Sequence, residues 1–257
     1  MPAEVTAAAL VPLLLRDQLA AARSLGEAGH DAAVCIGFEN PYTPALFLLN
    51  DQRFPVVLFN RRFPWLPLPA VLVDDQAPTR QLVDALVTLG HRNFCMVSHF
   101  SAGDSPAGRN MVSAWTDRLC RHGLLKSCAA PLRILPWLPG LGRNKNLFAD
   151  IFLRPDRPTA VVFTTALWAR RFLHDTRIAR FRVPDHLSLA VFYPGECRLR
   201  TPAGPFLTTV DIDHRRAAQC ILEMVGQLLD GRSKPANIRI PPGLRFTDSI
   251  GPAPCLP

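Results

Sequence analysis

The residue types needed for proton transfer occur in this sequence without the spacing that catalysis requires. His174 and Asp175 could form a relay in which a carboxylate orients an imidazole base. They are neighbours on a predicted helix, however, where adjacent side chains diverge. His91 follows Gly90, a glycine placed to end a helix, so a capping or packing role is favoured over that of a base. With no nucleophile elbow and no phosphate-binding loop, we predict no catalytic residues and a protein that is not an enzyme.

Candidate metal and cofactor ligands are also scattered. The nearest groups of cysteine and histidine lack the spacing of zinc ligands: Cys120, His122 and Cys128, and the lone pair Cys95 and His99. The Gly-Leu-Gly segment at residues 140–142 lacks the third glycine and the preceding strand of a dinucleotide site, so we interpret it as a turn. We therefore predict no metal and no cofactor.

Charge and composition are those of a globular protein. The formal net charge is +8, and the densest group of arginines is Arg170, Arg171, Arg177, Arg180 and Arg182. We interpret this group as a solvated helix face, with attraction to DNA or to an anionic effector as the alternatives. No run approaches the roughly 18 apolar residues of a membrane helix, and no basic residue precedes the apolar N-terminal stretch. With seven scattered cysteines, the sequence predicts a cytoplasmic protein with no membrane contact.

Residues 55–97 organise the rest of the chain. They contain apolar runs at residues 56–59, 70–73 and 94–97, each typical of a strand buried on both faces. Asp74 and Asp75 could supply N-cap oxygens to a helix that follows the second run and ends at Gly90. A strand, a helix and a second strand in one sheet predict a right-handed parallel crossover.

Strands and helices alternate along most of the remaining chain, which predicts a parallel doubly wound α/β sheet. Helices are expected at residues 10–29, 112–119, 144–152, 165–180 and 217–229; strands are expected at 31–38, 132–135, 159–163, 187–192, 206–210, 238–240 and 244–246.

Several short motifs occur in a familiar order. They are Pro55-Val56-Val57, Asn60-Arg61, Val73-Asp74-Asp75, Leu89-Gly90-His91-Arg92, RPDRPTAVVF with VPDHLSLAVF, and LTTVDID. Their order and spacing over residues 31–249 resemble the effector-binding domain of the LacI/GalR family of bacterial transcription regulators. The Leu-Gly-His segment followed by a basic residue is the most specific of them.

The resemblance implies a two-lobed, periplasmic-binding-protein-like type I fold in which the chain passes three times between the lobes. We place these passages near Gln76, Val210 and Ser233, so one lobe holds residues 1–76 and 210–232 and the other 77–209 and 233–257. Family domains have a strand, a helix and another strand before the strand at 31–38, and a helix-turn-helix before those. Only thirty residues precede residue 31, so we expect either that the N-terminal strands are missing or that the first strand is replaced by a segment within residues 5–14. No segment fits a helix-turn-helix.

The family pocket implies polar groups that this sequence has changed. Met111 stands at the position of an arginine, with Arg109 nearby as a substitute; Thr165-Ala166 and Tyr193-Pro194 stand where an Asn-Asp pair and an Asp pair are expected. Either the ligand is less polar, or is held by aromatic stacking from Trp137, Trp168 and Tyr193, or the pocket is vestigial. Each tryptophan could also be a packing residue, and Asp74 is better interpreted as a helix cap than as a ligand contact. The candidate ligand-binding residues are Arg109, Trp137, Thr165, Trp168, Tyr193 and Asp74.

The resemblance therefore implies the effector-binding and dimerisation domain of a LacI-type regulator. It would sense a sugar-like small molecule, form a homodimer and act on operator DNA through a helix-turn-helix outside this chain. Two alternatives remain: a free solute-binding protein of the same fold, and a regulator whose vestigial pocket leaves only dimerisation.

Overall fold

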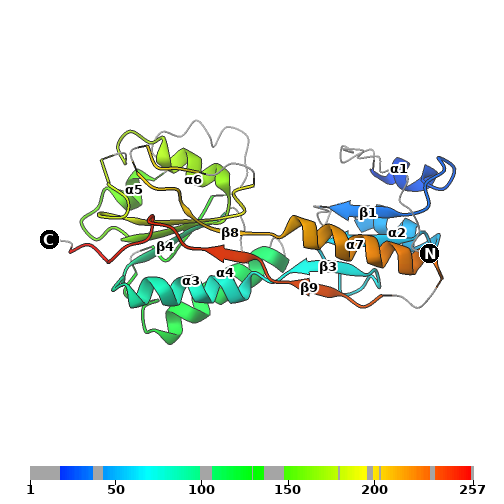
Figure 1. Ribbon diagram of the computed structural model, residues 1–257, viewed down its shortest axis with the longest axis horizontal. Coiled ribbons are helices and arrows are strands. Elements are labelled where there is room, and N and C mark those ends of the chain that lie inside the picture. The colour runs from blue at the N-terminus through cyan, green and yellow to red at the C-terminus, as the bar shows by residue number, and fades with distance from the viewer. Residues whose placement is uncertain are drawn as a thin grey trace. The chain divides into compact units, whose positions relative to one another are not determined.

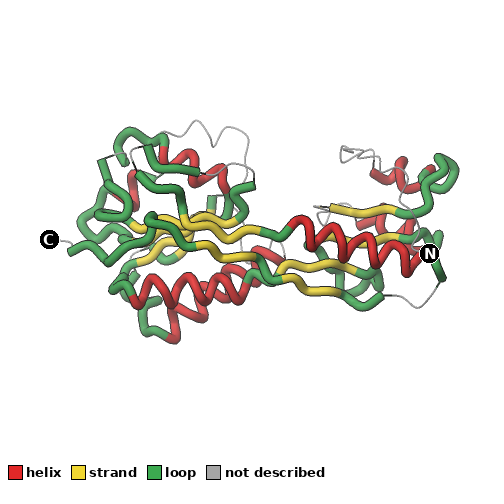
Figure 2. Tube along the Cα trace, viewed as in Figure 1, coloured by secondary structure: helices red, strands yellow, loops and turns green. Residues whose placement is uncertain are grey.

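The computed structural model describes residues 18–36, 43–98, 106–128, 130–135, 148–178, 180–195, 199–202, 204–231 and 235–255. These residues form two compact units. Figure 1 labels the helices and several of the strands, and Figure 2 colours the same trace by secondary structure.

The first unit holds the described residues up to Asp74 together with Asp213–Ile240. Its sheet is parallel and has the order β1-β2-β3-β9. The strands are β1 (Ala33–Ile36), β2 (Val56–Phe59), β3 (Ala70–Val73) and β9 (Ile238–Ile240).

Helices cover the two faces of this first sheet. Val56 and Leu58 of β2 pack in one buried cluster with residues of α1 (Gln18–Ser24) and α2 (Thr43–Asp51). Val57 alternates to the opposite face and is fully buried. Helix α7 (His214–Leu229) contacts β2, β3 and β9. Its buried stripe, Ala217, Cys220 and Met224, has the spacing of one helix face.

The second unit holds Asp75–Ile212 and the described residues from Pro241 onward. Its sheet has the order β10-β8-β7-β6-β4-β5. The strands are β4 (Phe94–Ser98), β5 (Leu132–Ile134), β6 (Ala160–Phe163), β7 (Ser188–Phe192), β8 (Thr208–Asp211) and β10 (Gly243–Arg245). All neighbouring strands are parallel except β10, which pairs antiparallel with β8.

Alternation along β4 divides the core of the second unit into two clusters. Phe94 and Met96 pack with α3 (Gln76–Thr88) and α4 (Pro106–Arg121), and the ring of Phe94 meets that of Trp115 edge to face at 6.1 Å. Cys95 and Val97 pack on the other face with α5 (Ala149–Phe152) and α6 (Ala166–Leu173). The predicted parallel doubly wound α/β architecture is confirmed.

Several predicted elements differ from the structure. Helix α6 is shorter than the predicted 165–180, and α5 covers only the end of 144–152, whose first residues lie outside the described ranges. In the predicted helix at 10–29, residues 10–17 also lie outside them, and α1 ends at Ser24 before a turn. Helix α2 was not predicted. Its Thr43-Pro44 start is a signal that could have found it, because proline is favoured in the first turn of a helix.

Two expectations concern the ends of β3 and β9. The sequence placed the third passage between lobes near Ser233, whereas β9 still pairs in parallel with β3, so the chain leaves the first unit after Ile240. The other two boundaries follow Asp74 and Ile212. The predicted side-chain cap of Asp75 on α3 is wrong. Asp75 is the N-cap residue, with a helical φ of −73° and ψ of −11°, and its carboxylate makes no cap hydrogen bond in this part of the chain.

Candidate functional site

The carboxyl ends of β4, β6 and β7 meet at one edge of the second unit's sheet. Val97 pairs with Phe163, and Phe163 pairs with Val191, so the residues that follow these three strands are brought level. The Thr164 N–H donates to the Val97 carbonyl at 3.0 Å. In open α/β sheets ligands bind outside this edge, which makes it the candidate site.

Thr165 connects β6 to α6 in the conformation of an N-cap residue. Its φ of −148° and ψ of 152° are extended, but the hydroxyl makes no cap hydrogen bond. Thr165 Oγ1 is buried and has no hydrogen-bond partner in the described ranges. A hydroxyl at this position ordinarily accepts from an N–H of the first turn, so this one remains available to another group.

Trp168 lies in the first turn of α6 and is 3% exposed. It packs with Phe163 and Phe172 in the cluster on the α5 and α6 face. The indole Nε1 is buried with no acceptor among the described residues. The guanidinium of Arg171 lies 5.8 Å from the centroid of the Trp168 ring. A buried N–H without an acceptor costs about 1–3 kcal/mol, so an acceptor supplied by a ligand would be favourable here.

Tyr193 follows β7 in an uncommon backbone conformation. Its φ is +52°, in the left-handed region that glycine and asparagine adopt most readily. The backbone is held there because the Tyr193 N–H donates to the Val210 carbonyl at 2.8 Å. The ring packs at 6.0 Å from that of Phe192, on the α3 and α4 face, and the buried hydroxyl has no partner within the described chain. Strained backbone held in place by its surroundings is typical of functional sites.

The other candidate residues are less closely joined to this edge. Arg109 is exposed on α4, while Met111 is fully buried among the residues that join α3 and α4 to the sheet, so this position has a packing role. Trp137 lies outside the described residues. Asp74 is half-buried in the first unit, directly after β3, and its N–H donates to the Ile240 carbonyl at 2.9 Å. The structure therefore places Thr165 and Tyr193 directly after β6 and β7 at this edge and Trp168 in the first turn of α6. The side chains of Trp168 and Tyr193 pack on opposite faces of the sheet.

His91 is a buried packing residue at the opposite, amino-terminal edge of the same sheet. Its Nδ1 lies 2.9 Å from Thr159 Oγ1, and its Nε2 lies 3.0 Å from Ser188 Oγ and 3.1 Å from the Gly251 carbonyl. A carbonyl only accepts, so Nε2 carries the proton and Nδ1 accepts from Thr159. Burial lowers the pKa of His91 and favours the neutral ring. The packing role favoured from the sequence is confirmed.

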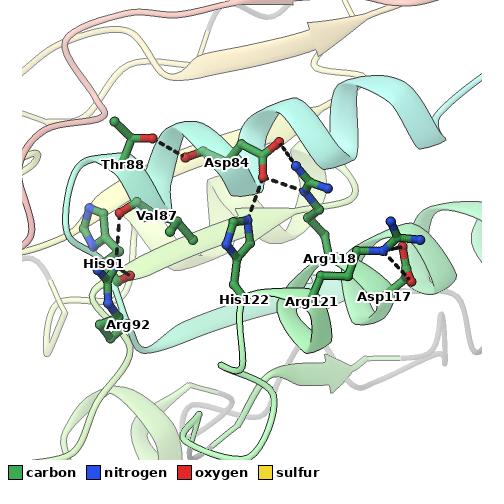
Figure 3. Close-up of polar contacts among 9 residues, drawn as sticks. All are labelled: Asp84, Val87, Thr88, His91, Arg92, Asp117, Arg118, Arg121 and His122. Carbon is green, nitrogen blue, oxygen red and sulfur yellow. Dashed lines mark hydrogen bonds and ion pairs between the residues drawn. The ribbon is translucent and has the colours of Figure 1, made fainter.

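An ion-pair network between α3 and α4 was not found from the sequence. Asp84 accepts two hydrogen bonds of 2.6 Å from the Arg118 guanidinium and one of 2.8 Å from His122 Nε2, as Figure 3 shows. The hydrogen bond from Arg118 is the main reason that the pKa of Asp84 is lowered. Arg118 and His122 lie 34 and 38 residues from Asp84, with no local spacing to link them. The network joins two helices and does not reach the carboxyl edge of the sheet.

The remaining titratable groups form no further site in the described ranges. Asp175 pairs with Arg177 at 2.8 Å and His174 is exposed at the end of α6, so the two do not form a relay. No three histidine, cysteine, aspartate or glutamate side chains of the described chain are placed to hold a metal ion. Among the helices described, none is long and apolar enough to span a membrane. The chemistry available at the sheet edge is therefore hydrogen bonding and aromatic packing.

The sequence of this chain is similar to a protein-family model and to a curated protein. The family model of the periplasmic binding protein-like domain matches residues 83–250. A curated protein of Paenibacillus polymyxa, the probable HTH-type transcriptional regulator EndR, is 23% identical over 217 residues, which are 79% of this chain and 59% of that protein. This chain thus spans about 59% of the length of that relative.

Three solved structures of regulators have the same fold. A LacI transcriptional regulator from a Rhodococcus species has a TM-score of 0.75 and 24% identity, covering 91% of this chain and 83% of its own. A LacI family transcriptional regulator from Mycobacterium smegmatis has a TM-score of 0.73 and 24% identity, covering 92% and 84%. The dimeric Lac repressor with an 11-residue C-terminal deletion has a TM-score of 0.73 and 18% identity, covering 95% and 85%.

Proposed function

Because this chain belongs to the periplasmic binding protein-like domain family and has the fold of LacI-family regulators, we propose that it is the effector-binding part of a LacI-type transcription regulator. Its effector is a small molecule, a sugar or a compound of similar size. DNA is read by a helix-turn-helix outside this chain, as the name of the Paenibacillus relative indicates for that protein. The chain acts as a homodimer in the cytoplasm.

One observation at the sheet edge supports a working pocket over a vestigial one. Thr165 Oγ1, Trp168 Nε1 and Tyr193 OH are all buried and have no hydrogen-bond partner in the described ranges. Buried polar groups in folded proteins are nearly always paired, so three such atoms following adjacent strands require an explanation. A bound effector supplies the missing partners.

The mechanism follows from differential affinity. An effector that binds one arrangement of the regulator more tightly than another shifts the population toward the first. A shift of 10-fold in operator affinity requires a coupling free energy of about 1.4 kcal/mol between the effector and DNA sites. The chain thus works as a binder and not as a catalyst.

Thermal unfolding against a panel of sugars, sugar acids, sugar phosphates, nucleobases and amino acids tests this function. A ligand at about 100 times its dissociation constant stabilises the folded chain by about 2.7 kcal/mol, or roughly 5–10 °C for a chain of this size. A shift confined to one chemical class would establish a working pocket. A cooperative unfolding transition that no compound moves would refute effector binding and favour the vestigial pocket.

The oligomeric state separates a regulator from a free solute-binding protein. We expect sedimentation equilibrium to give the mass of a dimer, about twice 28.4 kDa, over a concentration range from about 1 to 50 μM. A monomer that still binds a small molecule would favour the solute-binding alternative.

A further inference from the structure

The amino terminus of α6 offers hydrogen-bond donors at the candidate site. Helix α6 begins at Ala166, immediately after the carboxyl end of β6. The first N–H groups of an α-helix have no acceptor within the helix, and the helix dipole places partial positive charge at this end. Thr165, whose hydroxyl would normally accept from one of these groups, makes no such bond. The end of α6 is therefore left without its usual side-chain cap.

Trp168 provides an independent sign that a ligand binds here. Its indole N–H is donor-only, its side chain is 3% exposed, and Nε1 has no acceptor in the described part of the chain. Side chains of an α-helix lean toward its amino terminus, so a residue in the first turn extends toward the same end as the free N–H groups. Thr165 Oγ1, also buried and without a described partner, stands directly before that turn.

The charges around this helix end favour an anion. Helix α6 has no acidic residue in its first turn, and the Arg171 guanidinium lies 5.8 Å from the Trp168 ring centroid. Asp175, beyond the far end of α6, is paired with Arg177. Asp211 also ends a strand at this edge, but on β8, two strands away, where its Oδ1 accepts from the Ile212 N–H. Among the described residues, donors therefore outnumber carboxylates where β6 meets α6, whereas a polyol site needs acceptors as well.

We propose that the effector carries an anionic oxygen group, a carboxylate or a phosphate, which binds at the amino terminus of α6. The group accepts hydrogen bonds from Trp168 Nε1, the Thr165 hydroxyl and the first N–H groups of the helix, with Arg171 adding positive charge. This inference rests on the proposed effector function and specifies the chemical class of the ligand. Helix amino termini commonly bind carboxylate and phosphate groups in this way.

Matched pairs of probes test the proposal. Each pair has the same body with and without the anionic group: gluconate and glucose 6-phosphate against glucose, and benzoate against benzyl alcohol. Inorganic phosphate alone is included, and sodium chloride keeps the ionic strength equal. We expect the anionic member of at least one pair to raise the unfolding temperature and to bind at least about 10-fold more tightly than the neutral member. The carboxylate and phosphate arms show which source of the anionic oxygen the site accepts.

Two conservative substitutions locate the effect. Trp168→Phe keeps the aromatic packing and removes the N–H, and Thr165→Val removes the hydroxyl at nearly constant volume. Each substitution should weaken binding of the anionic probe by about 10-fold or more. Thr165→Ser keeps the hydroxyl and should retain binding. Trp115→Phe is the matched tryptophan control, because the Trp115 indole N–H already donates to the Pro131 carbonyl at 2.8 Å. This control should lower stability and leave the anion preference unchanged.

The outcomes separate this inference from the proposed function. Equal binding of anionic and neutral members, or an anion preference that survives both Trp168→Phe and Thr165→Val, would overturn the anion site and leave an effector-binding domain standing. A chain that binds no compound of either charge, in this set and in the wider panel, would overturn both.

Discussion

Replacing His91 by alanine should lower the free energy of unfolding by about 2–4 kcal/mol at pH 7. The imidazole is fully buried and contacts Thr159, Ser188 and Gly251. Thr159 directly precedes β6, Ser188 is the first residue of β7, and Gly251 follows β10. Removing a large buried side chain commonly costs about 2–5 kcal/mol through lost contacts and the cavity left behind. The loss of polar partners is partly offset, because the Ser188 hydroxyl also donates to the Gly251 carbonyl and accepts from the Gly251 N–H. We therefore expect a value in the lower part of that range.

The difference in stability between wild type and His91→Ala should shrink as the pH falls. Burial lowers the pKa of folded His91, so below about pH 6.5 the unfolded chain takes up a proton that the folded chain does not. Stability from neutral His91 is complete above pH 6.5 and is lost as the pH falls through the unfolded pKa. Between pH 7 and pH 5.5 the loss is at most about 1.3 kcal/mol, and the alanine variant does not experience it.

Urea denaturation at pH 7.0, 6.25 and 5.5, followed by tryptophan fluorescence and circular dichroism, measures both effects. The midpoint should fall in the variant with an unchanged slope, since the same surface is exposed on unfolding. A stability loss below about 1 kcal/mol at pH 7 would refute the packing role. A difference that grows toward pH 5.5 would mean that folded His91 is protonated, contrary to the neutral ring bound to Gly251.

Four further substitutions test other parts of the structure. Asp84→Asn should cost about 1 kcal/mol at pH 7, because the ion pair with Arg118 is half-exposed. The lowered pKa of Asp84 contributes stability that is present above about pH 4 and is lost as the pH falls through the folded pKa, so the urea midpoints of variant and wild type should converge as the pH is lowered below about 4. Tyr193→Phe should leave thermal stability equal or up to about 1 kcal/mol higher, since it removes a buried hydroxyl without a described partner, while the shift caused by an effector falls. Gly90→Ala should cost about 1–2 kcal/mol in urea, because Gly90 has a φ of +91°, and Gly123→Ala, with a φ of +69°, should behave alike. An unchanged midpoint for both glycine variants would contradict the strain argument.

Much of the fold could be predicted from the sequence because its strands are buried on both faces. Continuous apolar runs such as residues 56–59 and 94–97 exclude a half-exposed strand and a surface helix alike, and both are strands in the structure. Helix ends were less predictable: α6 stops at Leu173 although helical spacing continues, because the next residues form turns around the pair of Asp175 and Arg177. Local patterns do not record such contacts.

The position of the candidate site could be predicted from the sequence, but the burial, hydrogen bonding and backbone conformation of its residues could not. Counting along the motifs placed Thr165 and Tyr193 after β6 and β7, where the structure has them. The sequence could not show that their hydroxyls are buried without described partners, since that depends on packing from several distant segments. It also could not show the left-handed backbone of Tyr193, because tyrosine rarely adopts a positive φ and nothing in the local sequence indicates one here.

In the second sheet, the residues of the sequence motifs and the candidate-site residues lie at opposite edges. His91, Thr159 and Ser188 lie at the amino ends of β4, β6 and β7, and their hydrogen bonds join three strands and the Gly251 carbonyl. Thr165 and Tyr193 lie at the carboxyl ends of β6 and β7. Strands of four or five residues, at about 3.3 Å each, separate these edges by roughly 13–16 Å.

At that distance substitutions at one edge need not disturb packing at the other, and free-energy changes at sites more than about 7–10 Å apart are usually additive. The double variant His91→Ala with Tyr193→Phe should therefore unfold with the sum of the two single changes, within about 0.5 kcal/mol. Coupling of more than about 1 kcal/mol would show that the pocket edge and the motif edge form one cooperative unit, so that a change of ligand would also require a change of scaffold.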